Sequence, residues 1–139
     1  MSSTFGDFNR ALVEDIRKHG KATGGPFAGR DVLILTTKGA KSGVTRVNPI
    51  VFTRDEDKLV IVASKGGAPT NPSWYHNLRE HPEVTVEVGH DKFTARARQV
   101  EGAEYDRLFK YHADTNPGFW DYKKRTTRKM PVIVLERVG

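Results

Sequence analysis

Residues 31–64, DVLILTTKGAKSGVTRVNPIVFTRDEDKLVIVAS, decide the fold of this chain. The stretch is rich in Val, Ile, Leu and Thr, and most of these residues favour the extended backbone of a β-strand. Two turns divide it into three predicted strands, at residues 31–37, 44–54 and 58–64. Consecutive parallel strands need a long crossover, usually a helix, whereas only short turns lie between these strands. The stretch therefore predicts an antiparallel sheet.

A helix is predicted before the sheet, at residues 7–19. Phe8, Leu12 and Ile16 recur every four positions, which places their side chains on one face of a helix. Asp7 is a suitable N-cap for this helix. The glycine-rich residues that follow predict a loop.

The second half of the chain alternates helical and extended patterns. Asn71 suits a helix N-cap, Pro72 suits the first helical position, and Pro82 ends the predicted helix. The other predicted elements are strands at residues 84–88, 92–100 and 130–137, a helix at 103–112, and loops at 21–29 and 115–118. We expect one mainly β domain with some α: a barrel of about six antiparallel strands with short helices packed outside. The barrel would take residues 28–139, after an N-terminal helix and loop at residues 1–27.

Length and composition exclude several classes of protein. The chain has 139 residues, the size of one domain, and its 37% hydrophobic content argues against wholesale disorder. Without cysteine it has no disulfides, no thiolate metal site and no cysteine nucleophile. No apolar run is long enough to cross a bilayer, and the N-terminus does not resemble a signal peptide. The expected location is the cytoplasm.

The charge balance favours an anionic partner. The formal net charge is +6, from 23 Lys and Arg against 17 Asp and Glu. This surplus suits nucleic acid, an anionic lipid surface, or a phosphorylated or carboxylated small molecule. The cations concentrate at residues 38–46 and in the run KKRTTRK at Lys123–Lys129. The second run lies beside aromatic residues, a combination that suits nucleic acid, although a solvated basic face would have the same sequence.

The turn GAKSG at residues 39–43 has the ingredients of an anion site. Its glycines allow backbone N–H groups to converge, Ser42 adds a hydroxyl, and Lys41 and Arg46 can pair with anionic oxygens. It is not a nucleotide-binding P-loop, because no glycine precedes the lysine and a strand follows instead of a helix. The alternative interpretation is a solvated hairpin turn.

A second glycine-rich segment, ASKGG at residues 63–67, follows a predicted strand and precedes the helix that contains Trp74 and Asn77. Such a loop suits backbone contacts to a flat ligand, with Ser64 and Lys65 at the barrel rim. The alternative is a connection that needs glycine only for its geometry. Trp74 and Asn77 lie three positions apart and share one helix face, and a buried Asn77 would need hydrogen-bond partners.

Other chemistries fit the sequence poorly. The histidines, at positions 19, 76, 81, 90 and 112, are dispersed, and no carboxylate spacing completes a metal site, so we predict no metal. No serine stands in a nucleophile motif.

Four blocks of sequence together resemble the deazaflavin (F420)-dependent nitroreductase family. They are TTKGAKSG at residues 36–43 with Arg46 and Pro49, ASKGG at 63–67, NPSWYHNL at 71–78, and TTRKMP at 126–131. The resemblance covers about residues 28–138. It implies a split β-barrel and the coenzyme F420, a deazaflavin whose tail carries a phosphodiester and an oligoglutamate chain.

The resemblance also implies roles for individual residues. Those holding the tail would be Lys41, Ser42, Gly43 and Arg46. Those around the ring would be Pro49, Val62, Ala63, Ser64, Lys65 and Gly66, supported by Trp74 and Asn77. Tyr122 matches a position where family members place a tyrosine on the substrate side, so it is the candidate catalytic residue, as a substrate contact or proton donor. Val51 and Phe119 stand where some members have tyrosine.

The expected function is an F420H2-dependent reductase that transfers a hydride to an electron-poor conjugated acceptor: a quinone, an enone or a nitroaromatic. Two alternatives remain open. One is an FMN-binding split-barrel oxidoreductase, and the other is a non-catalytic basic module for nucleic acid or anionic membrane. We expect no nucleic acid partner for the enzyme. Peripheral membrane contact could come from Lys123–Lys129 or from Phe5, Phe8, Leu12 and Ile16 on the N-terminal helix.

Overall fold

The computed structural model describes residues 4–138, with side chains from residue 9 onward. In this part of the chain seven strands form one sheet: β1 Val32–Lys38, β2 Thr45–Val51, β3 Thr53–Asp55, β4 Lys58–Val62, β5 Glu83–Val88, β6 Asp91–Gln99 and β7 Val132–Arg137. Their order is β2-β1-β5-β6-β7-β4-β3, and every neighbouring pair is antiparallel. The predicted antiparallel architecture is confirmed, with seven strands where about six were expected.

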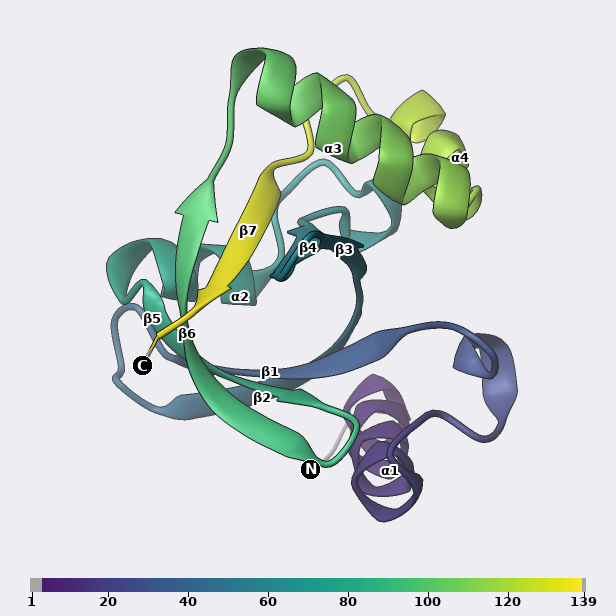
Figure 1. Cartoon of the computed structure of the whole chain (residues 1–139), viewed down its shortest axis with the longest axis vertical. Coiled ribbons are helices and arrows are strands. Elements are labelled where there is room, and N and C mark those ends of the chain that lie inside the picture. Colours follow the sequence, from purple (N-terminus) through teal and green to yellow (C-terminus); the bar gives the residue numbers. More distant parts are fainter. Residues whose placement is uncertain (1–3, 139) are drawn as a thin grey trace.

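The sheet is rolled because its two edge strands are consecutive in the chain. Only Phe52 separates β2 from β3, yet these strands occupy opposite edges of the sheet. The edges must therefore approach each other, and the sheet curls into the half-barrel of Figure 1. The single strand predicted at residues 44–54 is wrong for this reason. The Phe52 N–H still donates to the Asp31 carbonyl at 3.0 Å, whereas Thr53 already pairs with Val60 of β4.

Four α-helices accompany the sheet: α1 Thr4–His19, α2 Ser73–Glu80, α3 Gly102–Thr115 and α4 Gly118–Arg125. Two short 3-10 helices, η1 Gly25–Phe27 and η2 Lys65–Gly67, lie in the predicted loops. Because α1 already begins at Thr4, Asp7 is not its N-cap. Asn71 is not the N-cap of α2 and Pro72 is not its first residue, because the helix begins one residue later, at Ser73, with Pro72 in the N-cap position. The Asn71 side chain instead accepts a hydrogen bond from Arg128. The sequence did not predict α4.

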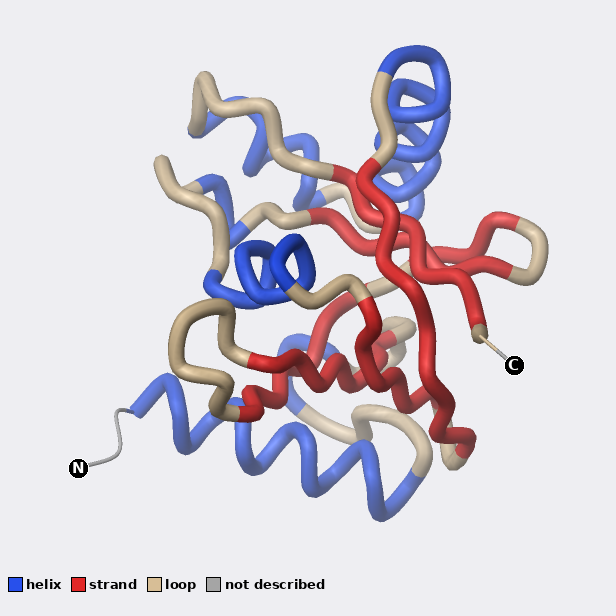
Figure 2. The backbone as a smooth tube through the Cα atoms, turned by 90° about the vertical axis from the view of Figure 1, so that its left-hand side faces the viewer, coloured by secondary structure: helices blue, strands red, loops and turns tan. Residues whose placement is uncertain are grey.

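The strands β1, β4 and β7 are buried on both faces. Alternate residues of β1 enter two different cores, with Val32 and Ile34 on one side and Leu33 and Leu35 on the other. The first core includes side chains from α1, α3 and α4, and the second includes side chains from α2. Figure 2 shows α2 between strands, with α1 along the lower side of the view. The edge strand β2 lies across a groove from the loop at residues 63–72, which connects β4 to α2.

The helix α1 packs on the sheet. Leu12 and Ile16 are buried, and Arg17 at the end of the helix forms an ion pair with Glu87 of β5 at 2.9 Å. The hydrogen bonds from Arg17 lower the pKa of Glu87. The side chains of Phe5 and Phe8, which the membrane prediction also used, lie outside the described residues. Within residues 4–138 no helix combines the length and the hydropathy that a membrane span requires.

Candidate functional site

A groove with a volume of about 630 Å³ lies along the outer edge of β2. One wall is β2 itself, another is the loop between β4 and α2, and a third is α4. Seven of the residues predicted to contact a ring or a substrate line it: Pro49, Val62, Ser64, Lys65, Gly66, Trp74 and Tyr122. Val51 and Phe119, the positions noted as departures from the family pattern, line it too.

The lining of this groove is apolar with a positive charge. Trp74, Phe119 and Pro49 offer flat surfaces. Among the lining residues that the structure describes, the ionisable groups are Tyr122 and the cations Arg30 and Lys65. No carboxylate is among the lining residues that the structure describes. A site of this volume and composition suits a flat, electron-rich or anionic small molecule.

The predicted anion turn lies beyond the groove, at the far end of the same edge strand. Arg46 precedes the groove-lining Asn48 by two residues on β2, a separation of about 7 Å along a strand. The side chains of Lys41 and Arg46 are exposed, and neither side chain has a hydrogen bond or ion pair with the residues that the structure describes. Both cations are therefore available to an anionic ligand that extends out of the groove.

Several backbone N–H groups of this turn already have hydrogen-bond partners within the protein. The N–H groups of Gly39 and Gly43 donate to the carbonyls of Val44 and Gly39, at 2.8 and 3.0 Å. The Val44 N–H donates to the hydroxyl of Ser42 at 3.1 Å. These three N–H groups close the turn and are not free for a ligand. The predicted convergence of backbone N–H groups on an anion stays a prediction, and it would have to come from the N–H groups of Lys41 and Ser42.

Asn77 and Trp74 contribute to different parts of the site. Trp74 lines the groove, whereas the amide of Asn77 points to the turn. Asn77 donates to the Thr37 hydroxyl at 3.1 Å and accepts from the Ala40 N–H at 3.0 Å. The prediction that a buried Asn77 needs partners is confirmed, and these partners make Asn77 a support of the turn. Ala63 lies in the core and not in the groove.

The loop after β4 has an unusual backbone. Lys65, Gly66 and Gly67 all have positive φ angles, of 47°, 64° and 82°. A Cβ at Gly66 would meet nothing within 4 Å, so this residue leaves open space at the groove. A Cβ at Gly67 would lie 2.8 Å from the Tyr122 carbonyl oxygen. Glycine is therefore required at Gly67 for the contact with α4, as well as for conformation.

Comparison with known proteins identifies the family. A family model described as F420H(2)-dependent quinone reductase matches residues 8–137. The chain belongs to this family. It is thus an oxidoreductase whose reductant is the reduced coenzyme F420, and the expected enzyme class and cofactor are confirmed.

Individual relatives of this F420H2-dependent family are similar over most of the chain. An F420H(2)-dependent quinone reductase of Mycobacterium tuberculosis is 42% identical over 108 residues, 76% of this chain and 72% of the relative. A solved F420-H2 dependent reductase is 37% identical with a TM-score of 0.71, covering 77% of this chain and 95% of that one. A structure described as a domain-swapped dimer is 34% identical with a TM-score of 0.73, covering 96% and 100%.

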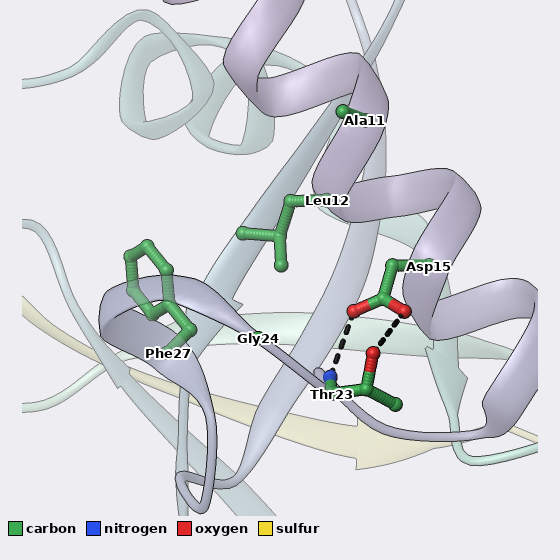
Figure 3. A pocket seen from close by; sticks show the side chains of 6 residues that line it. All are labelled: Ala11, Leu12, Asp15, Thr23, Gly24 and Phe27. Atoms are coloured by element: carbon green, nitrogen blue, oxygen red, sulfur yellow. Dashed lines mark hydrogen bonds between the residues drawn. The ribbon is translucent and has the colours of Figure 1, made fainter.

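The sequence did not predict that the N-terminal segment of this quinone reductase family member borders the groove. Asn9 on α1, Phe27 on η1 and Arg30 all line it. Phe27 also lines a smaller cavity of about 270 Å³ beneath α1 (Figure 3). There Asp15 accepts hydrogen bonds from the N–H and hydroxyl of Thr23, at 2.7 and 2.6 Å, and these bonds lower the pKa of Asp15. They attach the segment containing Phe27 to the helix.

Four of the five cations in the basic run Lys123–Lys129 have contacts within the molecule. The ammonium groups of Lys123 and Lys129 lie over the rings of Phe109 and Tyr105, at 5.3 and 4.2 Å. Arg125 lies over the ring of Tyr122 at 5.9 Å. Arg128, which the sequence analysis did not single out, binds the groove loop. Lys123, Lys124, Arg125 and Lys129 nevertheless remain exposed, so a role of this run in binding nucleic acid or lipid stays a prediction.

Proposed function

We propose that this chain reduces a quinone-type acceptor with F420H2 and that the reaction takes place in the groove along β2. One observation carries the proposal. The residues that the family resemblance assigns to the ring and the substrate come from β2, β4, the following loop, α2 and α4, and seven of them line this single groove.

The groove fits the chemistry of the coenzyme. Its volume of about 630 Å³ lies within the range of small-molecule sites, and its surfaces are flat and mostly apolar, as a tricyclic ring requires. Its described lining residues include two cations and no carboxylate, which suits a ligand with a strongly anionic tail. The exposed Lys41 and Arg46 continue the positive charge along β2 to the place where such a tail would leave the groove.

We assign three groups of residues to three parts of the coenzyme. Lys41 and Arg46 would pair with the phosphodiester and glutamate oxygens of the tail, and Ser42 and Gly43 would shape their turn. The ring would lie on Pro49, Val62 and Trp74, with Ser64 and Lys65 at its polar edge. Gly66 would allow the ring to approach the backbone of the loop.

When bound, the coenzyme supplies a hydride, and the protein aligns the donor with the acceptor and excludes water. A quinone that accepts a hydride becomes a hydroquinone anion and then needs one proton. Tyr122 lines the groove, and its hydroxyl can supply that proton while the ring of Phe119, 5.2 Å from that of Tyr122, holds it in place. Arg30 adds a positive charge that favours the anionic product.

Titration of the purified chain with F420, FMN and a random oligonucleotide tests the proposal. We expect F420 alone to bind with micromolar or better affinity and to quench the fluorescence of Trp74, and the reduced coenzyme to be consumed when a quinone is added. Binding of FMN in place of F420 would contradict the cofactor assignment. Salt-sensitive binding of the oligonucleotide without any response to F420 would favour a basic binding module.

A panel of acceptors tests the substrate class. Reduced F420 is supplied with a quinone, an enone and a nitroaromatic compound, and its oxidation is followed by absorbance. We expect turnover to be fastest with the quinone. Turnover with the nitroaromatic compound alone would contradict the proposed substrate class and leave the coenzyme assignment intact.

A further inference from the structure

The guanidinium of Arg128 binds the groove loop at four points. Its Nε donates to the carbonyl of Ala68 at 3.1 Å, and its Nη2 donates to the carbonyl of Ser64 at 2.8 Å. Its Nη1 donates to the carbonyl of Ala63 at 3.1 Å and also to the side-chain oxygen of Asn71. One side chain therefore holds both ends and the middle of the segment 63–71, which lies about 60 residues earlier in the chain.

The loop depends on this side chain because its own backbone bonds are few. The Gly67 and Ala68 N–H groups donate to the carbonyls of Ser64 and Lys65, at 3.0 and 3.1 Å, and these bonds close only a single turn. Three consecutive residues with positive φ angles, one of them Lys65, are costly to maintain without outside contacts. Arg128 supplies charge-assisted contacts to the carbonyls of Ala63 and Ala68, and it gives the Ser64 carbonyl a second hydrogen bond beside that from Gly67.

Arg128 is itself held firmly. The segment that follows it is fixed at two points, since the Tyr105 hydroxyl donates to the Met130 carbonyl at 2.7 Å and the Ala63 N–H donates to the Pro131 carbonyl at 2.8 Å. Burial raises the pKa of Tyr105 to about 12, so its hydroxyl remains a donor at neutral pH. The Arg128 N–H donates to the Thr126 hydroxyl at 3.0 Å. The guanidinium is thus presented to the loop from a rigid support.

We propose that Arg128 is a positioning residue for the coenzyme: it fixes the loop 63–71 in the conformation that places Ser64, Lys65 and Gly66 at the groove. The proposal rests on the proposed function for the identity of the ligand. Arg128 does not itself line the groove. It acts on the ring side of the site, whereas Lys41 and Arg46 act on the tail side.

The geometry also requires a guanidinium. Three nitrogens of one planar group reach four acceptors that point in different directions. An ammonium is a point charge with three donors on a flexible stem and cannot reproduce this fork. Arg128→Lys keeps the charge and is therefore the informative substitution, while Arg128→Ala leaves a space that a free guanidinium ion can enter.

The test compares two ligands and a matched control. Arg128→Lys is titrated with F420 and with the tail-less deazaflavin chromophore, and Lys124→Met removes one cation from the same basic run as the control. We expect Arg128→Lys to weaken binding of both ligands by the same factor, about tenfold or more, as loss of charge-assisted hydrogen bonds implies. Lys124→Met should bind both ligands as the wild type does. In Arg128→Ala, millimolar guanidinium chloride should restore part of the affinity, and sodium chloride should not.

A second readout needs no coenzyme. Hydrogen exchange of the Gly67 and Ala68 amides in the ligand-free chain should become at least about tenfold faster in Arg128→Lys, while strand amides exchange as before. Unchanged exchange together with unchanged affinity for both ligands would overturn the proposal. If the wild type binds no F420 at all, the proposed function fails, and faster exchange would then leave Arg128 as the support of a loop without this ligand. A selective loss of affinity for full-length F420 would place Arg128 on the tail side and would also contradict the inference.

Discussion

The side-chain oxygen of Asn77 accepts a hydrogen bond from the backbone N–H of Ala40 at 3.0 Å. The same amide donates to the hydroxyl of Thr37, so α2 is attached to the end of β1 and to the turn that follows it. Trp74, one turn earlier on α2, lines the groove. A single helix therefore sets the distance between the groove and the exposed cations of the turn.

Asn77→Ala should weaken this attachment. Loss of both hydrogen bonds at a buried position should lower the free energy of unfolding by about 1–3 kcal/mol, measured in urea. Affinity for full-length F420 should fall while affinity for the tail-less chromophore is retained, since Trp74 is untouched. Asn77→Asp separates the two bonds: it keeps the acceptor for the Ala40 N–H, replaces the donor to Thr37 with a second acceptor, and adds a buried negative charge that should lower stability further. An Asn77→Ala variant with wild-type stability and affinity would contradict this role.

Lys41→Ala combined with Arg46→Ala should act on binding and not on turnover. Both side chains are exposed and outside the groove. Their loss should therefore raise the Kd for F420 and leave kcat unchanged. Two lost charge contacts correspond to about 10- to 100-fold in Kd at low salt, less at high salt. The double variant Lys21→Ala with Lys124→Ala removes the same net charge elsewhere and should bind normally. The tail assignment is wrong if the two double variants behave alike in titrations across salt concentrations.

Gly67→Ala should disturb the contact between the loop and α4. An added Cβ would lie 2.8 Å from the Tyr122 carbonyl oxygen, and φ at this residue is 82°. Gly29→Ala is a matched control, with a φ of 80° and nothing within 4 Å of an added Cβ. Both variants should lose about 1 kcal/mol from the backbone conformation, and Gly67→Ala should lose more, with reduced turnover. Equal losses of stability in thermal unfolding would show that the close approach is unimportant.

His112 should make the protein sensitive to acid. It is fully buried, its Nδ1 lies 2.9 Å from the Thr53 hydroxyl, and burial lowers its pKa from 6.5 to about 4. Below pH 6.5 the unfolded chain takes up a proton that the native state does not. This histidine should therefore contribute a loss of up to about 3 kcal/mol in the free energy of unfolding as the pH falls from about 6.5 to about 4, with no further loss below that.

Unfolding in urea between pH 4 and 8 measures this contribution of His112. In His112→Gln, which retains a hydrogen-bonding group near Thr53 but cannot titrate, stability at pH 7 should fall modestly and its dependence on pH should flatten. A His112→Gln profile parallel to that of the wild type would assign the acid sensitivity to other groups.

Tyr122→Phe should lower turnover more than coenzyme affinity. The substitution keeps the ring beside Phe119 and removes only the hydroxyl that we propose as the proton donor. Loss of a general acid costs about 100-fold or more in rate, so kcat with a quinone should fall by this order while the Kd for F420 is retained. An unchanged kcat across the pH range would indicate that water delivers the proton.

The antiparallel fold and the ligand-facing loop could be predicted from local sequence patterns, whereas most other residues of the groove were assigned only through the family resemblance. Turns between the first strands require antiparallel pairing, and the ASKGG segment has the composition of a loop that approaches a ligand. The break at Phe52 could not be predicted in the same way. A bulky apolar residue continues a strand pattern, and only the pairing of Thr53 with β4 shows that the chain has changed partners.

The contacts of Arg128 could not be predicted from the sequence for a related reason. In the run KKRTTRK every cation has the same local pattern, and nothing in it distinguishes a solvated side chain from one that binds carbonyls about 60 residues away. One feature of the sequence could have predicted how α4 faces the groove. Phe119 and Tyr122 lie three positions apart, which places them on the same face of a helix, and both line the groove. The self-closure of the turn at residues 39–44 also required coordinates, because Gly and Ser suit both an anion site and a closed hairpin.

The structure of this chain crystallised with F420 is the most direct measurement of the central claim. The account predicts the deazaflavin ring between Pro49 and the backbone of Lys65 and Gly66, with the phosphodiester beside Lys41 and Arg46. A ring in this groove with the tail directed instead toward Lys123–Lys129, or a ring bound anywhere outside the groove, would contradict it.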